Sequence, residues 1–104
     1  MKYLVFTADW CRPCKELKQS IELLQKMTGS IDLEYIDIAA APDLVERYAI
    51  RSVPTIIKLE TNTHVLHSVG KLDETLEHIV EVARVVGQQD FHDLNLFFNS
   101  EEKV

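Results

Sequence analysis

Cysteine, glycine, proline and tryptophan are all scarce in this 104-residue sequence, which contains two, three, three and one of them, respectively. Two cysteines are too few for a fold that is held together by several disulfides. Because 46% of the residues are hydrophobic, the chain can build an apolar core instead. No internal repeat and no low-complexity linker divides the sequence. We therefore expect a single globular domain without a second one.

Long apolar runs are missing as well. No window approaches the roughly 20 apolar residues that a membrane-spanning helix needs. The N-terminal run 3–6 is too short for the apolar region of a secretory signal peptide. We therefore expect a cytoplasmic protein that does not bind membranes. In that compartment a two-cysteine chain more often uses its thiols for catalysis than for structure.

Positive charge is scarce relative to negative charge, with 11 Lys and Arg against 17 Asp and Glu and a net charge of −6. An acidic surface repels phosphate backbones, so a nucleic acid is an unfavourable partner. The simplest role of the acidic surface is solubility.

The two cysteines, Cys11 and Cys14, are separated by two residues and lie between an apolar segment and a helical pattern. A cysteine in the first turn of a helix meets unpaired backbone N–H groups and the positive end of the helix dipole. Both favour the thiolate over the thiol. This placement predicts that Cys11 is a nucleophile. Cys14, one turn further along, is placed to attack a mixed disulfide at Cys11 and release a reduced substrate.

Hydrophobic periodicity predicts a strand, a helix and a second strand in the first part of the chain. Residues 2–7 are short, apolar and rich in β-formers, which predicts a buried strand. A helix should begin near Pro13, end at Gly29 and turn one apolar stripe inward, namely Cys14, Leu17, Ile21, Leu24 and Met27. Residues 31–38 alternate and predict a strand that is parallel to the first through a right-handed crossover.

In the second part we expect a short helix after Pro42 and a hairpin of strands 54–59 and 63–69. Asp73 is a plausible N-cap for a helix that ends at Gly87, with an inner stripe of Leu76, Ile79, Val80, Ala83 and Val86. The order βαβαββα predicts an α/β fold with a four-stranded mixed sheet flanked by helices.

Residues 88–104 follow this predicted unit of residues 1–87. Four apolar residues recur there at three- and four-residue steps and predict a short amphipathic helix: Phe91, Leu94, Phe97 and Phe98. The helix could pack on the domain itself, or it could contact a partner or a second copy. We therefore treat residues 88–104 as a C-terminal extension, either part of the same domain or a tail.

The segment Trp10-Cys11-Arg12-Pro13-Cys14 and the lysine after it resemble the active-site segment of the thioredoxin family, normally Trp-Cys-Gly-Pro-Cys-Lys. Residues 50–55 resemble the family's loop with a cis-proline opposite the dithiol, and residues 68–70 resemble the segment whose glycine completes the substrate groove. The resemblance covers about residues 2–86 and implies the thioredoxin fold. It also implies that this sequence starts at the strand before the dithiol and lacks the N-terminal strand and helix of longer members.

The resemblance implies roles for particular residues. Cys11 and Cys14 would be catalytic, and substrate would contact Trp10, Arg12, Pro13, Val53, Pro54 and Gly70. A cis-Pro54 would turn the backbone of Val53 toward an extended substrate strand. The family likeness further implies a monomer that holds no cofactor besides its redox-active disulfide. Its partners would be disulfide-containing proteins and a thioredoxin-reductase-type flavoenzyme that supplies electrons from NADPH.

Three positions depart from the family pattern. Arg12 replaces the usual glycine and adds a permanent cation, which predicts a more stable thiolate and a less reducing couple. Val5 and Tyr35 stand where the family usually has a buried aspartate and its lysine. Deprotonation of Cys14 would then depend on water, the departing thiolate, Asp9 or Lys15. We expect slower resolution of the mixed disulfide.

A zinc site is disfavoured. Cys11 and Cys14 together with His64 and His67 imitate a two-cysteine, two-histidine set, but 49 residues lie between Cys14 and His64. The histidines also lie three apart on a predicted strand and would point to opposite faces. The leading hypothesis is a thiol–disulfide oxidoreductase that reduces protein disulfides. A glutaredoxin-like, glutathione-dependent reductase and a non-catalytic thioredoxin-like subunit of a larger assembly remain alternatives.

Overall fold

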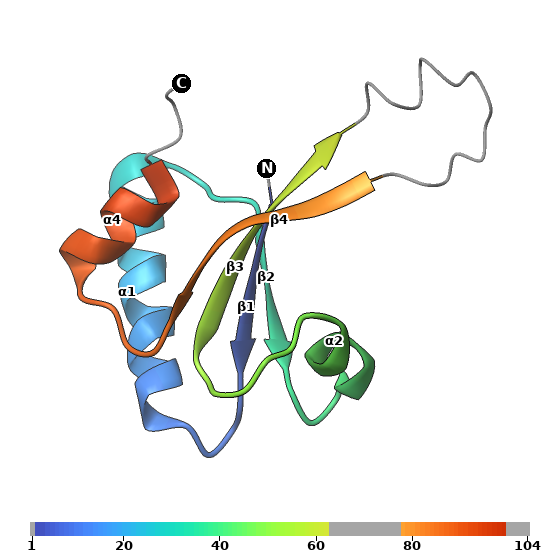
Figure 1. Cartoon of the computed structure of the whole chain (residues 1–104). Coiled ribbons are helices and arrows are strands. Elements are labelled where there is room, and N and C mark those ends of the chain that lie inside the picture. Colours follow the sequence, from blue (N-terminus) through green and yellow to red (C-terminus); the bar gives the residue numbers. More distant parts are fainter. Residues whose placement is uncertain (1, 63–77, 100–104) are drawn as a thin grey trace.

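The computed structural model describes residues 2–62 and 78–99 (Figure 1). Within these ranges the elements are β1 (Lys2–Thr7), α1 (Arg12–Thr28), β2 (Leu33–Asp37), α2 (Pro42–Arg47), β3 (Thr55–Asn62), β4 (His78–Val86) and α4 (Phe91–Asn99). The strands form one mixed sheet in the order β2-β1-β3-β4. β1 is parallel to β2, whereas β3 is antiparallel to both of its neighbours. The expected α/β class and mixed four-stranded sheet are confirmed.

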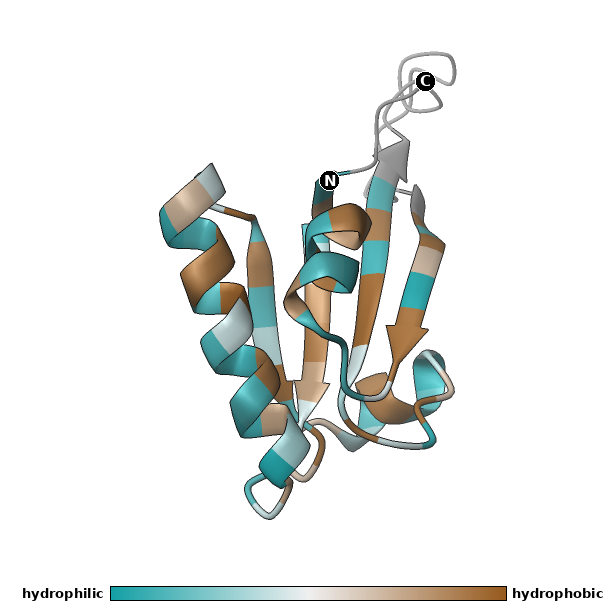
Figure 2. Ribbon diagram, turned by 90° about the vertical axis from the view of Figure 1, so that its left-hand side faces the viewer, coloured by the Kyte–Doolittle hydropathy of each residue, from teal (hydrophilic) through white to brown (hydrophobic). Residues whose placement is uncertain are grey.

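β1 is buried on both faces because each face of the sheet carries its own apolar cluster. Tyr3 and Val5 face a cluster with α1 and α4, and Leu4 and Phe6 face a second cluster on the side of α2. Figures 1 and 2 show α1 and α4 side by side on one face of the sheet. A strand that is covered from both sides needs apolar residues at every position, which explains its lack of polar alternation.

α1 lies on the sheet with the predicted apolar stripe, and Figure 2 shows hydrophobic and hydrophilic residues alternating along it. Its inward residues Cys14, Leu17, Ile21 and Leu24 are buried. Met27 was expected on this stripe, but its side chain is 64% exposed, because the core contacts of the helix end at Leu24. Gly29 caps the helix with φ of +108°, a conformation that favours glycine.

The chain after β3 differs from the expectation. Residues 78–86 form β4, which pairs antiparallel with β3, so the helix predicted over 73–86 is wrong over this range. Five of the nine residues of β4 are Val or Ile, which favour a strand, and the open edge of β3 offers them a partner. Two residues of the supposed inner stripe, Val80 and Val86, are exposed. The strand predicted at 63–69 and the N-cap Asp73 lie outside the described residues.

The amphipathic helix expected near the C-terminus is confirmed as α4. Leu94 and Phe98 are buried in the same cluster as α1 and the inward face of β1. The hydroxyl of Tyr3 donates a hydrogen bond to the carbonyl oxygen of Phe98 over 3.3 Å, and its ring meets those of Phe97 and Phe98 edge-on. α4 therefore covers the sheet beside α1.

Tyr35 on β2 packs against the same cluster, and its hydroxyl is buried without a hydrogen-bond partner among the described residues. Burial, and to a smaller degree the nearby carboxylate of Glu22, raise the pKa of Tyr35 to about 12. The phenol is therefore protonated and uncharged at neutral pH.

Replacing Phe98 by alanine should lower the free energy of unfolding by about 3–5 kcal/mol, because it empties a buried aromatic site between α4 and β1. The matched control is Leu96→Ala on the same helix, whose side chain is 53% exposed and whose loss should change stability by no more than about 0.5 kcal/mol. Urea unfolding measures both. Similar losses in the two variants would contradict the packing of α4 described above.

Tyr35 should make the protein less stable at alkaline pH. An ordinary tyrosine pKa is 10.0, against about 12 in the fold, so between these values the unfolded chain has lost a proton that the folded chain keeps. The contribution is complete below pH 10 and is lost as pH rises toward 12. Urea unfolding over this window should show a smaller loss in Tyr35→Phe than in wild type. Parallel losses would contradict the assignment.

Candidate active site

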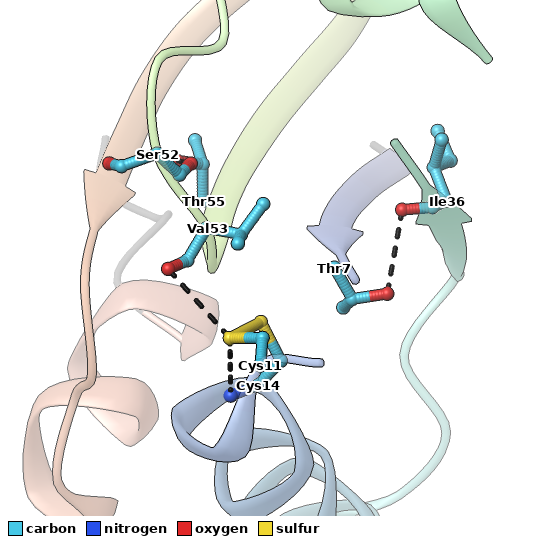
Figure 3. The surroundings of a disulfide bond; sticks show 7 residues. All are labelled: Thr7, Cys11, Cys14, Ile36, Ser52, Val53 and Thr55. Carbon is cyan, nitrogen blue, oxygen red and sulfur yellow. Dashed lines mark hydrogen bonds between the residues drawn. A yellow bond between two sulfur atoms is a disulfide. The ribbon is translucent and has the colours of Figure 1, made fainter. Parts of the chain in front are cut away.

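The dithiol lies where the chain leaves β1 and enters α1 (Figure 3). Cys11 is the N-cap residue, Cys14 lies in the first turn, and their sulfur atoms form a disulfide with the Cα atoms 5.3 Å apart. The backbone N–H of Cys14 donates a hydrogen bond to Sγ of Cys11 over 3.1 Å. In the reduced protein the same N–H group and the helix dipole would stabilise a thiolate at Cys11.

The two sulfurs are shielded, whereas the residues around them are not. Cys11 and Cys14 are 4% and 3% exposed and pack with Ala8 against Ile38 and Val53. The indole of Trp10 is 76% exposed, and Arg12 and Pro13 between the cysteines are also exposed. A molecule that approaches the disulfide therefore meets an aromatic face, a guanidinium group and a proline first.

The loop before β3 faces the dithiol from the other side. The Val53–Pro54 peptide bond is cis, as expected, and the carbonyl oxygen of Val53 lies 3.9 Å from Sγ of Cys11 (Figure 3). In the disulfide this sulfur carries no hydrogen, so only a reduced Cys11 thiol could donate a hydrogen bond across this distance. The hydroxyl of Thr55 donates to the carbonyl of Ser52 over 2.8 Å and ties the loop together. The fold thus brings Val53 and Pro54 to the dithiol.

Gly70, the expected groove glycine, lies outside the described residues. Gly87 lies beside the proline loop instead, because its N–H donates a hydrogen bond to the carbonyl of Pro54 over 2.8 Å. Its φ of +90° favours glycine, and a Cβ atom there would meet open space. The sequence contains Val-Gly twice, at 69–70 and 86–87, and both could follow a strand. The pairing of β4 with β3 singles out the second pair as the one next to Pro54.

A pocket of about 170 Å³ opens on the inner side of Cys14. It is lined by Thr7, Ala8, Asp9, Cys14, Lys15, Lys18 and Tyr35. Beside it, Val5 is completely buried and pairs in register with Tyr35 across β1 and β2. The two replaced positions are therefore neighbours in the sheet, and neither residue supplies a carboxylate or an amine. Asp9, Lys15 and Lys18 are the charged residues of the pocket lining.

No group of three or more His, Cys, Asp and Glu side chains within residues 2–62 and 78–99 could hold a metal ion. His64 and His67 lie outside these ranges. In the same part of the chain, no helix has both the length and the apolar character to cross a membrane.

Comparison with known proteins agrees with this geometry. The family model described as Thioredoxin matches residues 2–83. The thioredoxin of Chlamydia trachomatis is 35% identical over 69 residues, which cover 66% of this chain and 68% of that protein. Thioredoxin-1 of Drosophila melanogaster is 32% identical over 78 residues, or 74% and 73% of the two chains.

A solved structure extends the likeness over almost the whole chain. The germline-specific thioredoxin Deadhead of Drosophila melanogaster superposes with a TM-score of 0.69 and 26% identity, and the match covers 97% of this chain and 80% of that one. The family match, together with the Cys11–Cys14 pair at the start of α1, indicates a thiol–disulfide oxidoreductase. This chain belongs to the thioredoxin family.

Proposed function

We propose that the protein reduces disulfides of other proteins by cycling between the Cys11–Cys14 dithiol and the disulfide. The contact that supports this most directly is the N–H of Cys14 on Sγ of Cys11, because it favours an attacking thiolate at Cys11. The carbonyl of Val53, 3.9 Å from the same sulfur, lies where an extended substrate strand could form a backbone hydrogen bond.

The cycle has two exchange steps. The Cys11 thiolate attacks a substrate disulfide, and one substrate sulfur leaves with the electron pair and takes up a proton. Cys14 then loses its proton and attacks Sγ of Cys11. The second substrate sulfur leaves as a thiolate, and the protein retains the Cys11–Cys14 disulfide. Two electrons have passed from the protein to the substrate.

A thioredoxin-reductase-type flavoenzyme that draws on NADPH would return the two electrons. The family membership supports this partner, since the family generally acts on disulfide substrates together with a reductase. We place the reaction in the cytoplasm and assign it to a monomer.

Insulin reduction with NADPH and thioredoxin reductase tests the proposal. Wild type should be active, and Cys11→Ser should abolish turnover because the nucleophile is gone. Cys14→Ser should also stop turnover but accumulate a mixed disulfide at Cys11, which mass spectrometry detects. Inactivity of the wild type in this assay combined with activity driven by glutathione would identify a glutaredoxin-like reductase instead. Inactivity with both electron donors would contradict a reductase altogether.

Arg12 should stabilise the Cys11 thiolate, but only modestly, because it is exposed and its charge is screened. Replacing Arg12 by glycine should raise the pH midpoint for alkylation of Cys11 by about half a unit. Arg12→Lys keeps the charge and should retain the wild-type midpoint. Identical midpoints for wild type and Arg12→Gly would refute this role.

A further inference from the structure

The resolving step needs a thiolate at Cys14, which is 3% exposed. Where the family pattern has a charged pair on the neighbouring strands β1 and β2, this chain has the apolar Val5 and Tyr35, whose phenol is uncharged. Charged side chains do line the pocket of about 170 Å³ that Cys14 also lines. Its lining includes one carboxylate, that of Asp9, and two ammonium groups, those of Lys15 and Lys18. The deprotonation of Cys14 should therefore respond to these groups.

Lys18 has a defined position in this pocket. It follows Cys14 by four residues on α1, so the two side chains project from the same face of the helix. Its Nζ atom lies 4.9 Å from the centroid of the Tyr35 ring. That distance is within the range of a cation–π interaction. Because the Tyr35 ring is packed against the core, it provides a fixed platform for a side chain that would otherwise be mobile.

We propose that Lys18, held over the ring of Tyr35, is a positioning residue that stabilises the Cys14 thiolate through the shared pocket and thereby sets the pH dependence of the resolving step. This inference rests on the proposed function and adds a residue to it. The family pattern has a buried aspartate and its lysine where this chain has Val5 and Tyr35. Here a cation on α1, the helix that carries the dithiol, acts on Cys14 instead.

The step balances in protons and electrons. The pocket is large enough for several water molecules, and the Cys14 thiol gives its proton to one of them. The proton then passes to Asp9 or to bulk solvent. The Cys14 sulfur then bonds to Sγ of Cys11 as the bond between Cys11 and the substrate breaks. The substrate sulfur leaves with the electron pair, so the two cysteines are oxidised and the substrate is reduced.

The other charges around the pocket act in both directions. The carboxylate of Asp9, on the loop between β1 and α1, opposes a thiolate at Cys14. Glu22, one turn of α1 beyond Lys18, is close enough to raise the pKa of Tyr35 and also opposes a thiolate at Cys14. Lys15 lines the pocket and favours the thiolate. Lys18 is distinguished from Lys15 by its contact with the ring of Tyr35, which also lines the pocket.

One equivalent of dithiobis(nitrobenzoate), a chromogenic aromatic disulfide, separates the two exchange steps in a stopped-flow experiment. The reduced protein releases one coloured thiolate when Cys11 attacks and a second when Cys14 resolves the mixed disulfide. The first phase depends on reagent concentration and reports on the proposed function. The second phase is intramolecular and reports on Cys14. Both phases are recorded as a function of pH.

In Lys18→Met the pH midpoint of the second phase should rise by about half a unit, and its rate at neutral pH should fall about threefold. The first phase should remain that of the wild type. Lys26→Met, on the last turn of the same helix, removes the same charge far from Cys14 and should change neither phase. Added salt should reduce the difference between Lys18→Met and Lys26→Met.

The ring is tested separately. Tyr35→Phe retains the platform and should keep the wild-type midpoint, whereas Tyr35→Leu removes it and should move the midpoint toward that of Lys18→Met. Circular dichroism checks that Tyr35→Leu is folded. If it is not, the comparison of Lys18→Met with Lys26→Met decides alone, since both lysines are exposed.

Coinciding second-phase midpoints in Lys18→Met and Lys26→Met would overturn the role of Lys18. A shift in Tyr35→Phe as large as in Tyr35→Leu would assign the effect to the hydroxyl and overturn the platform. A wild type that lacks the first phase would refute the proposed function, and the inference with it.

Discussion

The hydrogen bond from the Cys14 N–H to Sγ of Cys11 is the interaction on which the active site depends. It exists because Cys11 occupies the N-cap position, where the first N–H groups of a helix have no partner within the helix. The position of the helix is fixed in turn by its buried stripe, which packs against β1 and β3. The apolar core therefore determines where an anionic sulfur is stabilised.

The local parts of this arrangement could be predicted from the sequence. The β1 run, the stripe of α1 and the cysteine pair are contiguous in the chain, so periodicity and spacing were sufficient to place them. The cis bond before Pro54 followed from the family resemblance, since an isolated proline is usually trans. The contact between Val53 and Cys11 joins residues 42 apart, and only that resemblance indicated it beforehand.

The parts that could not be predicted depend on contacts between distant segments. Residues 78–86 fit a helical stripe by spacing and a strand by composition, and pairing with the edge of β3 decides in favour of the strand. The position of Gly87 beside Pro54 follows from that pairing, and a Val-Gly pair that occurs twice in the sequence could not indicate it. The contact of Lys18 with Tyr35 joins α1 to β2, and neither residue by itself indicates this contact in the sequence.

The two sulfurs, although bonded to each other, are in different surroundings. Cys11 has the backbone N–H of Cys14 on one side and the Val53 carbonyl on the other, next to the exposed Trp10. Cys14 faces inward to a pocket with charged walls. An exchange in two steps requires such a difference, because the first sulfur must be a thiolate before substrate arrives and the second must become one only afterwards. A backbone donor is in place on Cys11, whereas Cys14 shares its pocket with charged side chains, so the reactivities of the two sulfurs can be tuned independently.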